Sequence, residues 1–146
     1  MSKQTQQQQT PYQQTIGQGA CVPTASRILA VDDNPLNLEI IKEIFDSEYE
    51  LYLVDSGTEA LRIARQFPPD VILLDVMMPS PNGYEICGLL KSDPNLRHSQ
   101  IIMVSANTDI DDRLEGYRTG ADDYVTRPFD PDELYAKVCV NLKNKS

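Results

Sequence analysis

The chain has 146 residues, of which 40% are hydrophobic and 24% are charged, and its net charge is −9. This length suits one domain with a real core and is too short for two, and the negative charge disfavours nucleic acid as a direct partner. No apolar run approaches the roughly 20 residues of a membrane span, and the first ten residues contain no apolar signal segment. We therefore expect a cytoplasmic protein with no membrane partner.

The three cysteines, Cys21, Cys87 and Cys139, lie far apart and form no Cys-x-x-Cys motif. This spacing argues against a zinc site or a disulfide framework, and we interpret Cys87 and Cys139 as core thiols. Residues 1–26 contain eight glutamines and a single charged residue. We predict a disordered, Gln-rich tail over residues 1–26 and one folded domain over residues 27–146.

The first half of the folded region alternates strands with helices. ILAV (28–31) is a predicted strand, and Asn34 can cap the helix that follows it. LYLV (51–54) is a second strand. Ser56 and Glu59 have the spacing of a capping box, which predicts the start of a second helix.

The second half continues this alternation. VILLD (71–75) is apolar on both faces, as expected for a parallel strand in the middle of a sheet. The remaining predicted elements are, in chain order, a third helix (82–91), the strand IIMVS (101–105), a fourth helix (109–119), the strand DYVT (123–126) and a fifth helix that begins at Asp130.

Five strands that alternate with five helices predict an α/β protein with a parallel sheet. Because crossovers between parallel strands are right-handed, few topologies are available. We expect a flavodoxin-like (βα)5 three-layer sandwich with strand order 2-1-3-4-5. In such sheets ligands bind beyond the carboxyl ends of the strands, so residues that follow different strands are expected to lie together.

Charged and hydroxyl side chains stand at four of these strand ends. They are, in chain order, Asp32 and Asp33 after the first strand, Asp75 at the end of the third, Ser105 at the end of the fourth and Arg127 after the fifth. Three carboxylates in one pocket repel each other and require a cation, and oxygen ligands without His or Cys favour Mg²⁺. A carboxylate can also act as a nucleophile and form an aspartyl phosphate. Each residue alone could be a turn or cap residue, but their joint placement favours a phosphoryl-transfer site.

The motifs at these strand ends resemble those of the receiver domain of two-component response regulators. The resemblance covers residues 27 to about 144, and four motifs carry it: AVDDN (30–34), LLDVMMPSPNG (73–83), VSA (104–106) and DYVTRPF (123–129). It implies that Asp75 is the phosphoacceptor. It further implies a Mg²⁺ site whose ligands are Asp32, Asp33, Asp75 and the backbone carbonyl of Met77.

The same resemblance implies that Ser105 is the switch hydroxyl, that Tyr124 is the switch aromatic and that the peptide bond before Pro128 is cis. Arg127 departs from the family pattern, which has lysine there, and the exchange is not conservative because a guanidinium is longer, planar and forked. Two hypotheses follow. Either the receiver is still phosphorylated, with altered rates or weaker coupling to the switch, or Arg127 pairs with Asp75 and mimics or blocks the activated state. We favour the first, because the other pocket residues match the family.

The resemblance implies a phosphorylation-activated signalling switch and not a turnover enzyme. A histidine kinase or a phosphotransfer protein would supply the phosphoryl group, and the receiver would catalyse only its own phosphorylation and dephosphorylation. The output would pass by contact to a downstream protein target, and a homodimer is a further expectation. Two alternatives stay open: an atypical pseudo-receiver that serves as an interaction module, or the receiver part of a longer regulator or hybrid kinase.

Overall fold

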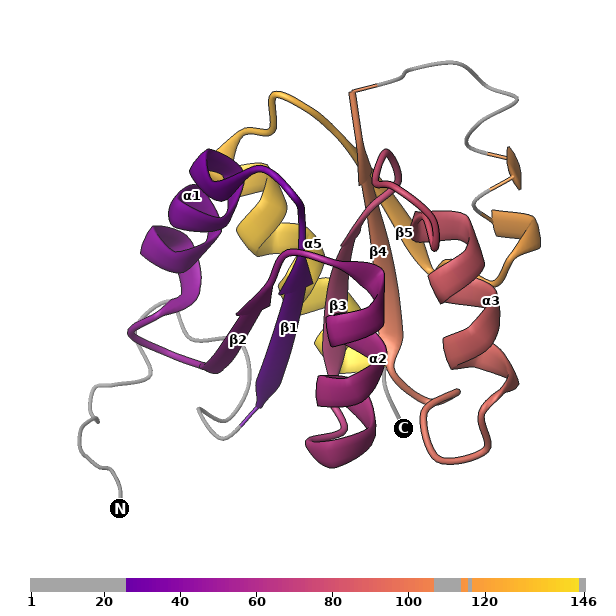
Figure 1. Ribbon diagram of the computed structural model, residues 1–146. Helices are drawn as coiled ribbons and strands as arrows, with labels where there is room; N and C mark the ends of the chain where they lie inside the picture. Colours follow the sequence, from indigo (N-terminus) through magenta and orange to yellow (C-terminus); the bar gives the residue numbers. More distant parts are fainter. Residues whose placement is uncertain (1–25, 107–113, 116, 145–146) are drawn as a thin grey trace.

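The computed structural model describes residues 26–106, 114–115 and 117–144 (Figure 1). Five strands form one sheet, and all four strand pairings are parallel. The strands are β1 (Arg27–Val31), β2 (Glu50–Val54), β3 (Val71–Asp75), β4 (Gln100–Ser105) and β5 (Asp123–Thr126). Their order is β2-β1-β3-β4-β5, which confirms the predicted flavodoxin-like topology.

Helices cover both faces of this sheet. In Figure 1, α1 (Pro35–Phe45) and α5 (Pro131–Asn144) lie on one face, and α2 (Gly57–Gln66) and α3 (Gly83–Ser92) lie on the other. The result is the three-layer arrangement expected from the alternation of strands and helices. Among the described residues, no helix is both long enough and apolar enough to cross a membrane.

Each face of the sheet has its own apolar core. One core joins residues of α2 and α3 to one side of the strands: Ala60, Ala64, Ile86 and Leu90 pack with Leu29, Ile72, Leu74 and Met103. The other joins α1 and α5 to the opposite side: Ile41, Phe45, Leu134 and Val138 pack with Ile28, Leu73, Ile102 and Val125. Full burial of one aliphatic side chain contributes about 1.5–3 kcal/mol to the stability of the fold. The many buried side chains of the two cores together hold the strands in place, and this fixes the positions of the strand ends.

The capping box predicted at α2 and a second one at α3 differ in the structure. At α3 the box is complete, since Asn82 accepts from the backbone N–H of Glu85 at 3.0 Å and the Glu85 carboxylate accepts from the N–H of Asn82 at 2.7 Å. At α2 only half of it forms, because Ser56 accepts from the N–H of Glu59 but the Glu59 carboxylate pairs with Arg62 at 2.7 Å. The competing cation one turn along the helix explains the difference.

Two predictions lie wholly or largely outside the described residues. One is the Gln-rich tail over residues 1–26, of which only the last residue is described. The other is the fourth helix over residues 109–119, of which residues 114–115 and 117–118 are helical. Gly120 follows with a φ of 106°, a left-handed conformation that suits glycine and ends a helix.

The cysteines match the expectation of core thiols only in part. Cys87 is a buried free thiol that donates to the carbonyl oxygen of Thr119 at 3.4 Å, and burial raises its pKa. Cys139 is also buried, but it is disulfide-bonded. The prediction of a free core thiol at Cys139 is therefore wrong.

Candidate functional site

Strand register brings the predicted acidic residues together at the carboxyl edge of the sheet. Val31 pairs with Leu74, so Asp32 and Asp33, which follow β1, come next to Asp75, which ends β3. Carboxylate oxygens of the three aspartates lie within 4.8 Å of one another. Asp32 and Asp75 are 2% and 1% exposed, whereas Asp33 is exposed.

Asp75 is fixed by the backbone around it. Its Oδ1 accepts a hydrogen bond from the N–H of Met77 at 3.1 Å. The first turn of α3 lies directly against the same residue, since a Cβ on Gly83 would come within 2.4 Å of the carbonyl oxygen of Asp75. Glycine at this position therefore lets the loop after β3 close tightly behind the phosphoacceptor candidate.

Burial and charge repulsion make Asp75 hard to ionise. Burial, followed by the Asp32 carboxylate, raises the pKa of Asp75 from 3.8 to about 6, against the opposing effects of the Met77 N–H and of Arg127. A raised pKa at a buried carboxylate that also faces a like charge is typical of a functional site. The carboxylate of Asp75 is consequently more basic than that of an ordinary aspartate.

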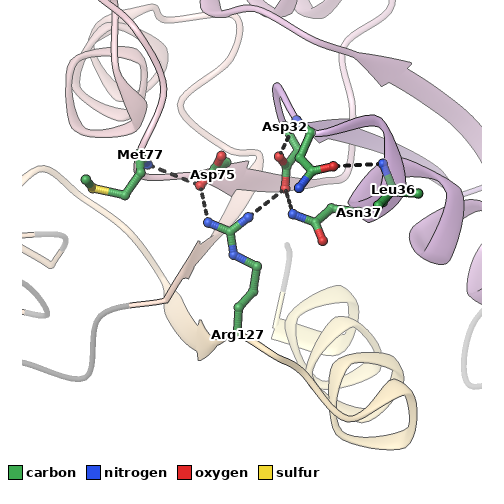
Figure 2. Close-up of polar contacts among 7 residues, drawn as sticks. Asp32, Leu36, Asn37, Asp75, Met77 and Arg127 are labelled. Atoms are coloured by element: carbon green, nitrogen blue, oxygen red, sulfur yellow. Dashed lines mark hydrogen bonds and ion pairs between the residues drawn. The ribbon is translucent and has the colours of Figure 1, made fainter.

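Asp32 is positioned by the start of α1. Its Oδ1 accepts from the N–H of Asn34 at 2.9 Å, and its Oδ2 accepts from the side-chain amide of Asn37 at 3.1 Å (Figure 2). Asn34 also accepts from the N–H of Leu36, as predicted for the cap of this helix. The sequence reasoning did not single out Asn37, although its place in the first turn after the acidic pair was a signal for it.

Arg127 bridges the two buried carboxylates. One terminal nitrogen lies 3.2 Å from Oδ2 of Asp32 and the other lies 2.9 Å from Oδ1 of Asp75 (Figure 2). The Arg127 side chain is only 17% exposed. The peptide bond between Arg127 and Pro128 is cis, as the resemblance implied. Pairing with Asp75 is the geometry of the second of the two hypotheses for Arg127, and the contact with Asp32 was not foreseen.

The two switch candidates lie on β4 and β5, the two neighbouring strands that precede Arg127. Ser105, the last residue of β4, is 1% exposed and pairs in register with Thr126, and its carbonyl oxygen accepts from the N–H of Arg127 at 2.6 Å. Tyr124, on β5, is 5% exposed and belongs to the core on the α2 and α3 face. Met77 is 66% exposed, and its backbone N–H is the group that contacts Asp75.

A pocket of about 290 Å³ adjoins the acidic residues on the side of α1. Its lining is formed by Asn37, Ile40, Ala106, Arg127, Pro128 and Phe129. Arg127 therefore has two kinds of surroundings. Its guanidinium contacts the carboxylates of Asp32 and Asp75, and it also lines the mostly apolar pocket.

The donor set fits a hard divalent cation. Three carboxylates with closely spaced oxygens, together with backbone carbonyls, are the ligands that Mg²⁺ prefers, and no His or thiol stands among them. The pKa of Asp75 is raised first by burial and then by the Asp32 carboxylate, so the negative charge of Asp32 also acts on Asp75. The fold and the site thus define a class of protein, a parallel α/β sheet with an acidic pocket at its carboxyl edge and a buried aspartate of raised pKa within that pocket.

Comparison with known proteins identifies the family. Residues 28–139 match the model of the response regulator receiver domain. The chain therefore belongs to the response regulator receiver domain family. It is 39% identical over 118 residues to the DNA-binding response regulator MtrA of Mycolicibacterium smegmatis, a match that covers 80% of this chain and 50% of MtrA.

Two further relatives agree with this assignment. The response regulator PleD of Caulobacter vibrioides is 39% identical over 115 residues, which cover 78% of this chain and 25% of PleD. The receiver domain of a signal transduction histidine kinase from Syntrophus aciditrophicus superimposes with a TM-score of 0.76 at 35% identity, over 82% of this chain and 92% of that domain. The chain thus spans half or less of the curated relatives and nearly all of the isolated receiver domain.

Proposed function

We propose that this receiver is a phosphorylation-activated signalling switch in which Asp75 accepts the phosphoryl group. The observation that carries the proposal is the state of the Asp75 carboxylate. Its Oδ1 accepts from the Met77 N–H and from Arg127, neither of which bonds to Oδ2, and the carboxyl also faces that of Asp32. One oxygen is therefore oriented, and the other is available as a nucleophile next to Asp32.

The proposed step is an in-line displacement at phosphorus. Oδ2 of Asp75 would form a bond to the phosphorus atom while the bond between phosphorus and the donor atom breaks, and the donor leaves with that electron pair. With a phosphohistidine donor the leaving group is the imidazole nitrogen, and with acetyl phosphate it is acetate. Because such transfers rely mainly on positioning and electrostatics, a buried aspartate with few partners suffices, and the module turns over only its own phosphoryl group.

Asp32, Asp33, Asp75 and the backbone carbonyl of Met77 would hold Mg²⁺. When bound, the ion would screen the negative charge between the carboxylates and an incoming phosphoryl group. The backbone of Asn34 and the side chain of Asn37 keep Asp32 oriented toward the pocket, since they donate to both of its oxygens. Asp33 is exposed and can reach an ion from the solvent side.

Ser105, Tyr124 and Arg127 would respond to the phosphoryl group. The hydroxyl of Ser105 and the guanidinium of Arg127 can donate to phosphoryl oxygens, and Arg127 is suited to bidentate contacts. Tyr124 lies three residues before Arg127, on the strand that pairs with the one that ends in Ser105. Their rearrangement would shift the surface near β5 and α5 between two packings.

The proposed partners are a histidine kinase or a phosphotransfer protein as donor and a downstream protein as target. The relatives support this assignment, because MtrA and PleD are response regulators. MtrA is named as DNA-binding, and this chain spans half of it. A receiver that works within a longer regulator or hybrid kinase is therefore the second form of the same proposal.

A homodimer is a further proposed partnership. Size-exclusion chromatography with light scattering, before and after phosphorylation, tests whether two copies of the chain associate.

Intact mass spectrometry tests the central step. The purified chain would be incubated with acetyl phosphate, with and without Mg²⁺, and Asp75→Asn would serve as the control. We expect the mass of one phosphoryl group to be added to the wild-type chain in the presence of Mg²⁺ and to be absent from the control. Addition of the group to the Asp75→Asn variant would contradict the assignment of Asp75.

A pseudo-receiver is the second candidate function, and the Arg127 bridge favours it. If the guanidinium never leaves Asp32 and Asp75, the chain would bind partners without being phosphorylated. The same assay separates the two functions, since a pseudo-receiver gains no mass under conditions that label another receiver. Restoration of labelling by Arg127→Lys would then assign the block to the arginine.

A further inference from the structure

We propose that Arg127 acts as a tethered counter-cation that competes with a divalent metal ion for Asp32 and Asp75, and so weakens the binding of that ion. The inference rests on the proposed metal site and adds a regulatory role for one residue of this chain. It arises from the contact between Arg127 and Asp32, which adds a second carboxylate to the pairing with Asp75.

The geometry assigns the guanidinium to two carboxylates at once. Its two terminal nitrogens contact different residues, at 3.2 Å from Asp32 and 2.9 Å from Asp75, in place of a fork on one carboxylate. These two carboxylates are 3% and 1% exposed, so little water screens the contacts. The planar guanidinium can bridge them with separate atoms, whereas a lysine ammonium would offer a single nitrogen.

The bridge covers two of the three candidate metal ligands. Asp33 is the third, and its carboxylate is exposed and receives no hydrogen bond or ion pair from the described residues. Because the three sets of oxygens lie within 4.8 Å of one another, an ion that contacts all three would lie close to the guanidinium. Two cations at such a distance repel each other strongly at a buried site. Arg127 and the ion therefore cannot both keep full contact with Asp32 and Asp75.

Competition of this kind has a consequence for Arg127 itself. Once released from the two carboxylates, the guanidinium becomes available to a phosphoryl group at Asp75. Arg127 already lines the pocket together with Ile40 and Phe129. The released side chain can therefore move into this pocket without crossing the apolar core. A single cation could thus neutralise the resting pocket and later contact the phosphoryl oxygens.

The test is metal affinity, measured without phosphorylation. The binding of Mg²⁺ and Mn²⁺ to the wild-type chain, Arg127→Gln and Arg127→Lys would be measured by isothermal titration calorimetry at fixed pH and ionic strength. Removal of a like charge next to the ion should tighten binding about tenfold or more for Arg127→Gln, with Arg127→Lys between the two. Arg62→Gln is the matched control, because Arg62 pairs with Glu59 on the exposed surface of α2 and should leave the affinity unchanged.

A spectroscopic readout makes the test specific to the contact. In ¹⁵N NMR spectra the Nε–H signal of Arg127, assigned by its absence from Arg127→Lys, should shift as Mg²⁺ is added, and the shift should follow the calorimetric binding curve. Arg127→Lys retains a cation in the pocket, so it also serves the test if Arg127→Gln is poorly folded. Equal or weaker binding by folded Arg127→Gln would overturn the competition and leave the proposed function intact. Absence of binding by every variant would overturn both.

Discussion

Replacement of Asp75 by asparagine should stabilise the metal-free protein at neutral pH. The carboxylate of Asp75 is buried beside that of Asp32, and its pKa is raised from 3.8 to about 6. An acid whose pKa is higher in the folded state than in the unfolded state stabilises the fold below about pH 4. That contribution is lost as the pH rises to about 6. Asparagine has the same shape and no charge, so it avoids this loss.

The magnitude follows from the size of the shift. A rise from 3.8 to about 6 corresponds to about 3 kcal/mol at pH 7.5. The value of about 6 already includes the opposing effects of the Met77 N–H and of Arg127, so their loss is not subtracted again. Arg127 keeps Asp32 as an anionic partner, so it is not left unpaired. We expect a stabilisation of up to about 3 kcal/mol at pH 7.5.

The assay is urea unfolding followed by far-UV circular dichroism, in EDTA, at several values of pH between 4 and 7.5. The free energy of unfolding of Asp75→Asn should exceed that of the wild type at pH 7.5, and the excess should shrink as the pH falls through 6 toward 4. Asp55→Asn is the control, since Asp55 is exposed and its substitution should change stability little at any pH. A variant less stable than the wild type at pH 7.5, or a difference that does not depend on pH, would refute the reasoning.

Three further predictions concern the helix that supports the site, and urea unfolding checks them all. Gly83→Ala should destabilise the protein by about 1–3 kcal/mol, because its Cβ would come within 2.4 Å of the carbonyl oxygen of Asp75; unchanged stability would contradict this close approach. Gly88→Ala, on the same helix, should stabilise the protein by about 0.5–1 kcal/mol, since nothing lies within 4 Å of its Cβ, and a loss would show hidden crowding. Asn82→Ala should cost about 1 kcal/mol through loss of the complete capping box, and Asn82→Asp should restore most of it.

The sequence predicted the strands better than the contacts between them. The five strands and their order follow from buried apolar runs such as Val71–Asp75, whose residues are all buried. The capping box at Ser56 was overestimated, because Glu59 has an arginine partner one turn further along its own helix. The expected free thiol at Cys139 was wrong, since spacing alone does not reveal which cysteines meet.

At the candidate site, too, the sequence predicted which residues are present better than which residues contact each other. Motifs placed Asp32, Asp33 and Asp75 at one edge of the sheet, and the structure brings their oxygens together. That Arg127 would bridge Asp32 as well as Asp75 depends on distances among the ends of β1, β3 and β5, which no local pattern encodes. The contribution of Asn37 depends in the same way on how the first turn of α1 faces the pocket.

The position of Arg127 also links the pocket to the proposed switch through the backbone. Its N–H donates to the carbonyl oxygen of Ser105, and the neighbouring pair Ser105 and Thr126 is in register between β4 and β5. Lys137 of α5 in turn donates to the carbonyl oxygen of Tyr124 at 3.0 Å. The guanidinium would move from the carboxylates to the phosphoryl group. If this movement displaced the backbone of Arg127, it would act on β5, which carries Tyr124, and through Tyr124 on α5. In this arrangement one side chain can sense the charge of the pocket while its own backbone conveys the change to β5 and α5.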